Sequence, residues 1–119
     1  MQRFTDLKVW QRSHQMVLAI YRLTKSFPDD ERYGLVSQLR RAAASVPTNI
    51  AEGSSRQGNQ DFARFLNIAE GSLAETHYLV LLGADLGYFA KPVADDHLAE
   101  LSEIARMLYA LRMKVEHKK

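Results

Sequence analysis

The sequence contains no cysteine, and only three prolines and six glycines occur in its 119 residues. Without cysteine, the chain can form neither a disulfide framework nor a thiolate nucleophile or metal site. The most apolar stretch, residues 78–86, is far shorter than the roughly 20 residues that span a bilayer. The polar residues 1–6 are not followed by the apolar segment of a signal peptide. We therefore expect a cytoplasmic protein without a membrane contact.

The sequence also lacks the signatures of common catalytic, metal and cofactor sites. None of the histidines (His14, His77, His97 and His117) follows a glutamate by three residues, as the ligands of di-iron bundles do. No two histidines have the spacing of a helical zinc site, and residues 53–58 lack the Gly-Lys-Ser/Thr ending of a P-loop. The sequence predicts no catalytic residue, no metal ligand and no cofactor, and an enzyme is the least favoured function.

The charge of the chain is only weakly informative. A net charge of +2 and a pI near 9.0 fall short of the strongly basic balance of a dedicated nucleic-acid-binding domain. Hydrophobic residues make up 46% and charged residues 25%, which is usual for a globular chain. We expect one domain over residues 1–119.

Apolar residues recur at spacings of three and four, which predicts helices. Four helices are expected over about 6–26, 31–55, 60–86 and 93–115. Asp6 is the expected N-cap of the first helix. Pro47 lies inside the second, where the apolar pattern keeps its phase, so we expect a kink there. Two short helices that meet at Pro47 are the alternative. Short connections favour an all-α, up-down-up-down antiparallel four-helix bundle.

The first helix has two neighbouring apolar lines. One contains Trp10, His14, Val17 and Tyr21, and the other contains Met16 and Ile20. We expect His14 to be a buried, hydrogen-bonded residue rather than a ligand.

A row of polar residues follows one side of the second helix, next to a stripe of small and apolar residues. The row consists of Gln38, Arg41, Ser45, Asn49 and Glu52. Under a structural interpretation, these residues satisfy polar groups at a contact between helices or subunits, and Glu52 pairs with Arg56. Under a functional interpretation, arginines of helices two and three bind phosphates. The residues of that candidate nucleic-acid site are Arg40, Arg41, Arg56 and Arg64, aided by Lys8 and Arg12.

The third helix is apolar nearly all round in its second half. Gly71, Ala74, Tyr78 and Leu82 line up on the side opposite its main apolar stripe. Because four helices leave no partner for a second apolar side, we expect this side to contact another copy of the chain.

Several stretches together resemble a known family. Residues 6–10 (DLKVW), 38–53 (QLRRAAASVPTNIAEG), 62–66 (FARFL) and 85–88 (DLGY) carry the likeness, which covers nearly the whole chain. The sequence is similar to the bacterial four-helix-bundle proteins encoded in intervening sequences of large-subunit ribosomal RNA genes. The accessory proteins of diversity-generating retroelements are a related branch.

The resemblance implies an up-down four-helix bundle that assembles as a ring-like homopentamer. In the related branch, pentamers bind nucleic acid and a reverse transcriptase. Our leading hypothesis is therefore a non-enzymatic homo-oligomer that binds RNA or DNA. A protein-protein scaffold without affinity for nucleic acid is the alternative.

Overall fold

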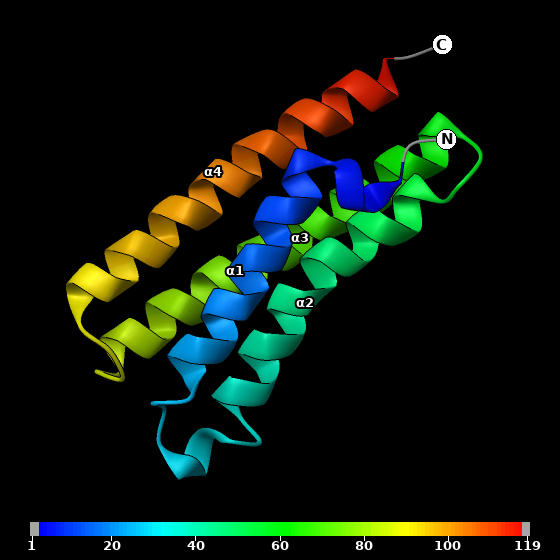
Figure 1. Cartoon of the computed structure of the whole chain (residues 1–119). Coiled ribbons are helices and arrows are strands. Elements are labelled where there is room, and N and C mark those ends of the chain that lie inside the picture. Colours follow the sequence, from blue (N-terminus) through cyan, green and yellow to red (C-terminus); the bar gives the residue numbers. More distant parts are fainter. Residues whose placement is uncertain (1–2, 118–119) are drawn as a thin grey trace.

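The computed structural model describes residues 3–117, which form four α-helices and two short 3₁₀ helices and contain no strand (Figure 1). In chain order these elements are η1 (Phe4–Asp6), α1 (Lys8–Thr24), η2 (Asp29–Glu31), α2 (Leu35–Ser54), α3 (Asn59–Asp85) and α4 (Lys91–Glu116). Successive helices run in opposite directions, so the predicted up-down-up-down four-helix bundle is confirmed. The bundle measures 48 × 24 × 20 Å.

The beginnings of the first two helices differ from the expectation. Asp6 ends η1 rather than capping α1, whose N-cap is Leu7 with no side-chain cap. The acidic residues after Pro28 form η2, so α2 begins at Leu35 instead of residue 31. Both differences arise where a tight 3₁₀ turn takes the place of a first helical turn.

Pro47 lies within one continuous helix, because α2 extends from Leu35 to Ser54. The alternative of two short helices meeting at Pro47 is therefore wrong. The apolar stripe of α2 keeps the same phase on both sides of the proline, and burial of that stripe offsets the backbone hydrogen bond that proline removes.

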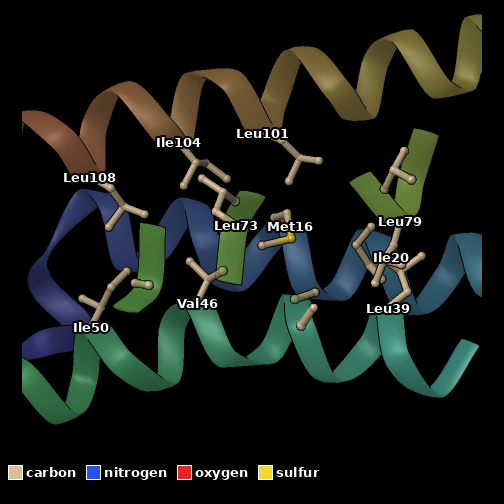
Figure 2. Close-up of a cluster of buried hydrophobic side chains, with 14 of the residues drawn as sticks. Met16, Ile20, Leu39, Val46, Ile50, Leu73, Leu79, Leu101, Ile104 and Leu108 are labelled. Atoms are coloured by element: carbon tan, nitrogen blue, oxygen red, sulfur yellow. The ribbon is translucent and has the colours of Figure 1, made fainter. Parts of the chain in front are cut away.

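The core lies along the bundle axis and takes side chains from all four helices (Figure 2). Its labelled members are Met16, Ile20, Leu39, Val46, Ile50, Leu73, Leu79, Leu101, Ile104 and Leu108. At the end where α2 turns into α3, a Cβ placed on Gly53 would lie 2.7 Å from the Cβ of Phe65. Glycine at this position allows the two backbones to approach closely.

The α1 side of the core uses the second of the two predicted apolar lines. Met16 and Ile20 are buried together with Ser13, whereas His14 is exposed. The expectation of a buried His14 is wrong. Its ring instead stacks on Trp10 at 5.1 Å between centroids, at the margin between α1 and α2. The reason is the orientation of α1 about its own axis, in which Ser13 rather than His14 faces the core.

At the other end of the bundle, α3 and α4 are joined by a turn that contains Gly87. This residue has a φ of +81°, which glycine adopts without the steric cost that other residues meet. None of the helices described between residues 3 and 117 is long and apolar enough to cross a membrane.

Candidate nucleic-acid interface

The arginines of residues 3–117 divide into two groups. Those with a carboxylate within 4.0 Å are Arg3, Arg12, Arg56, Arg64, Arg106 and Arg112. Those without an ion pair are Arg22, Arg32, Arg40 and Arg41. The last three, with Lys25, lie around the connection between α1 and α2. Three of the four unpaired arginines are thus gathered near one end of the bundle.

Arg12 links α1 to α4. Its Nε and Nη2 donate hydrogen bonds of 2.8 and 2.7 Å to the two carboxylate oxygens of Glu100. The hydrogen bond to Glu100 raises the pKa of Arg12. A bidentate pair of this kind is geometrically specific, so we assign Arg12 to the packing of α1 on α4. Lys8, one turn earlier, is exposed.

Arg56 and Arg64 meet around Asp61 at the α2–α3 turn. Arg64 lies 2.9 Å from Asp61 Oδ1, and Arg56 lies 3.9 Å from both Asp61 Oδ2 and Glu52 Oε2. Both guanidinium groups also lie over the ring of Phe65, at 4.8 and 4.6 Å from its centroid. Two carboxylates therefore offset the charge of these arginines.

Within residues 3–117, neither Arg40 nor Arg41 has a carboxylate partner. Arg40 Nε donates a 2.8 Å hydrogen bond to Thr24 Oγ1, and its guanidinium lies 4.4 Å from the centroid of Tyr21. Arg41 is exposed and donates a 3.1 Å hydrogen bond to Ser37 Oγ. Arg40 is thus held in place by α1, whereas Arg41 projects freely from α2.

These residues line two adjoining hollows between α1 and α2, which we call the α1–α2 cationic groove. The larger hollow has a volume of about 480 Å³ and is lined by Tyr21, Arg32, Tyr33, Val36, Ser37, Arg40, Arg41 and Ala44. The smaller has a volume of about 180 Å³ and is lined by Thr24, Lys25, Phe27, Pro28, Asp29, Arg32, Val36 and Arg40. The two hollows share Arg32, Val36 and Arg40. Asp29, in the lining of the smaller hollow, is the one carboxylate among these lining residues.

Of the six predicted nucleic-acid-binding residues, only Arg40 and Arg41 line this groove. The groove adds Lys25, Arg32 and Tyr33, which were not among the predicted residues. Local spacing gave no signal for these cations, because Asp29 lies four residues after Lys25 and three before Arg32, the spacings of helical ion pairs.

The polar row of α2 serves more than one purpose. Ser45 Oγ lies 2.8 Å from Ser72 Oγ of α3, and Asn49 Nδ2 donates hydrogen bonds to the carbonyl oxygen and Oγ of Ser45. These contacts belong to the packing of α2 on α3. Gln38, Arg41 and Glu52 are exposed.

The predicted contact side of α3 is open to solvent along most of its length. Gly71 and Ala74 are exposed, and Tyr78 is 60% exposed. Leu82 is half-buried because it packs against the core. Leu81 and Leu86, at 40% and 50% exposure, extend the open apolar surface. We call Gly71, Ala74, Tyr78, Leu81, Leu82 and Leu86 the α3 strip.

A second open surface is an apolar groove on the α1–α2 side, near the N-terminal end of α1. It has a volume of about 410 Å³ and is lined by Phe4, Trp10, His14, Val17, Ala44, Pro47, Thr48, Ala51 and Glu52. We call it the Trp10 groove.

The described residues contain no cluster of histidine, aspartate or glutamate that could hold a metal ion. His97 lies near Asp96 and Glu100, and its burial lowers its pKa. The charge of Asp96 opposes this effect of burial, and Glu100 is bound by Arg12.

The model of the family described as 23S rRNA-intervening sequence protein matches residues 5–110. The chain belongs to this family. A comparison with curated proteins finds no match.

A solved structure supports the assignment to the 23S rRNA-intervening sequence protein family. It is a protein with unknown function from the S23 ribosomal protein family of Bacteroides thetaiotaomicron, with a TM-score of 0.81 and 25% sequence identity. The match covers 87% of this chain and 97% of that one. The two proteins share the same bundle over nearly their full lengths.

Proposed function

We propose that this protein is a non-enzymatic, self-associating bundle that binds RNA or DNA through the α1–α2 cationic groove. The observation that carries the proposal is the gathering of Lys25, Arg32, Arg40 and Arg41 around one concave surface, with no ion pair to any of them in the described part of the chain. The paired arginines elsewhere in residues 3–117 keep their charges directed at carboxylates of the same chain.

An unpaired cation binds a phosphate without first breaking an internal ion pair. Each phosphate that such a cation neutralises releases condensed counterions, so affinity falls as the salt concentration rises. Arg40 contributes a preorganised guanidinium, because Thr24 and Tyr21 hold it before any ligand arrives. The exposed Arg32 and Arg41 are free to follow a phosphate backbone.

Binding measurements at several salt concentrations test this proposal. We expect the wild-type protein to bind a labelled RNA or DNA, and Arg32→Gln and Arg41→Gln each to lower the slope of log K against log salt by about one unit. Arg64→Gln is the matched control, since Arg64 is exposed but paired with Asp61, and it should change the slope less. Binding that does not depend on salt, or an equal effect of all three substitutions, contradicts the assignment to this groove.

Self-association is the second part of the proposal, and a pentameric ring is the assembly that we propose. A closed ring with one type of contact needs two different complementary surfaces on each subunit. The α3 strip and the Trp10 groove are two such apolar surfaces on different sides of the chain. A ring would bring five copies of the cationic groove together and raise the local positive potential well above that of one chain.

The Trp10 groove also favours one alternative, a protein-protein scaffold without affinity for nucleic acid. Its lining is mostly apolar, which suits a hydrophobic segment of another polypeptide better than a phosphate. The salt titration separates the two functions: a scaffold leaves the labelled nucleic acid unbound even at low salt.

A further inference from the structure

We infer that the ligand of the α1–α2 cationic groove is a single-stranded nucleic acid, one of whose bases stacks on the ring of Tyr33. This inference rests on the proposed function and adds the strandedness of the ligand and the residue that reads it.

Tyr33 is the most exposed large apolar side chain in the described part of the protein. It is 88% exposed, whereas the next, Tyr78, is 60% exposed. Within residues 3–117 its ring makes no contact with another ring, and its hydroxyl makes no hydrogen bond. The ring is therefore not held by the fold and is open to a planar ligand.

The backbone that carries Tyr33 is nevertheless well held. Gly34 N donates a 3.1 Å hydrogen bond to the carbonyl of Glu31, and Leu35 N donates one of 3.2 Å to Glu31 Oε1. These bonds enclose Tyr33 in a short turn immediately before α2. The ring thus projects from a fixed position at the rim of the groove rather than from a loose loop.

Cations flank this ring along the groove. Arg32 precedes it in the chain, and Arg40 and Arg41 lie on the facing part of α2. Three carboxylates, Asp29, Asp30 and Glu31, lie at the same connection, and Lys25 with the three arginines makes four cations. The guanidinium of Arg40 already lies over the ring of Tyr21, so the groove holds one cation–π contact and one ring without such a contact.

An exposed aromatic ring beside unpaired cations is the arrangement by which proteins bind single strands. The cations follow the phosphates, and the ring stacks on a base. In a duplex the bases are already stacked on one another, so a ring at the rim of a groove cannot reach their faces without unpairing them. A binding site of phosphates alone would have no use for Tyr33.

Fluorescence anisotropy with a labelled oligouridylate of about 12 nucleotides and an RNA duplex of equal length tests the inference. We expect wild-type protein to prefer the single strand. Tyr33→Ala should weaken single-strand binding about 5- to 150-fold, the range of one base stack, and leave duplex binding and the salt slope unchanged. Tyr33→Phe, which keeps the ring, should bind like the wild type.

A photocrosslink gives a second, direct measurement. An oligonucleotide that carries 5-iodouracil should form an adduct on the peptide that contains Tyr33, and polyglutamate of equal charge should compete poorly for the protein.

Equal binding of duplex and single strand, or unchanged single-strand binding by Tyr33→Ala, overturns the inference and leaves the proposed function standing. The absence of binding to either oligonucleotide at low salt overturns both. Because Tyr33 is 88% exposed and its side chain makes no hydrogen bond or ring contact within residues 3–117, we expect its substitution to leave the fold intact, which circular dichroism checks.

Discussion

The Tyr88 hydroxyl donates a 2.7 Å hydrogen bond to Glu31 Oε2, although the two residues are 57 positions apart. Tyr88 belongs to the α3–α4 turn and Glu31 to η2, which lie at the same end of the bundle (Figure 1). The other carboxylate oxygen of Glu31 accepts the backbone N–H of Leu35, the first residue of α2. One carboxylate thus joins two connections of the bundle and fixes the turn that presents Tyr33.

This carboxylate predicts a loss of stability in acid. The hydrogen bonds from Tyr88 and from Leu35 N lower the pKa of Glu31 in the folded chain. Its contribution to stability is therefore complete above the unfolded-state pKa of about 4.3 and is lost as the pH falls through the lowered folded pKa. We expect the stability difference between wild type and Glu31→Gln, measured by urea unfolding, to shrink as the pH falls below about 5. Parallel pH profiles of the two proteins would contradict this assignment.

The same hydrogen bond predicts the effect of Tyr88 at high pH. Glu31 raises the pKa of the Tyr88 phenol, so the phenol contributes stability below its unfolded pKa of about 10 and loses it as the pH rises through the raised value. We expect Tyr88→Phe to have a lower Tm than the wild type at neutral pH and a smaller loss of Tm in alkali. Glu31→Gln combined with Tyr88→Phe should be less destabilised than the two single changes added together, because they remove one shared bond.

Gly53 and Gly71 form a matched pair for testing the close contact between α2 and α3. A Cβ on Gly53 would lie 2.7 Å from Phe65 Cβ and 2.9 Å from Phe62 Cδ1, whereas a Cβ on Gly71 would have no neighbour within 4 Å. We expect Gly53→Ala to lower the free energy of unfolding by about 1–3 kcal/mol through overpacking. Gly71→Ala should raise it by about 0.5–1 kcal/mol through helix propensity. Chemical denaturation measures both free energies of unfolding. Equal effects of the two substitutions would contradict a close contact between α2 and α3 at Gly53.

The sequence predicted the fold well because the core follows a helical period. Every member of the apolar stripe on α2, from Leu35 to Ile50, is buried, and Pro47 does not interrupt it. The orientation of α1 about its own axis was not predicted, because both of its lines carry large apolar residues. Packing against α2 and α4 decides between them, and His14 was assigned to the wrong side for this reason.

The candidate site was less accessible to sequence reasoning. Arginines separate into paired and unpaired groups only when distant carboxylates are placed in space, as Glu100 is beside Arg12 at a separation of 88 residues. Local spacing did predict the pairing of Glu52 with Arg56, which lie 3.9 Å apart. The cationic groove joins residues on both sides of a turn, and no periodic pattern connects them.

Leu108 is fully buried on α4 and packs within the cluster of Figure 2. We expect Leu108→Ala to lower the free energy of unfolding by about 2–5 kcal/mol, because the substitution leaves a cavity that the rigid helices close only in part. Leu66→Ala, at a fully buried position of α3, should act similarly. Leu86→Ala is the control, since Leu86 is 50% exposed, and thermal and urea unfolding should show a clearly smaller change.

The α3 strip predicts how assembly depends on exposed side chains. Leu81 and Tyr78 lie on solvent-exposed positions of α3, so substitutions there should spare the fold and act on a contact between copies. We expect Leu81→Asp and Tyr78→Ala to reduce the mass in solution measured by light scattering while helicity by circular dichroism stays unchanged. Val93→Asp is the matched control, because Val93 has the same 40% exposure as Leu81 but lies on α4. Leu82→Asp should in addition lower stability, because Leu82 packs against the core. If Leu81→Asp and Tyr78→Ala retain the wild-type mass, or if the wild type is itself a monomer, the strip is not the contact that forms the ring.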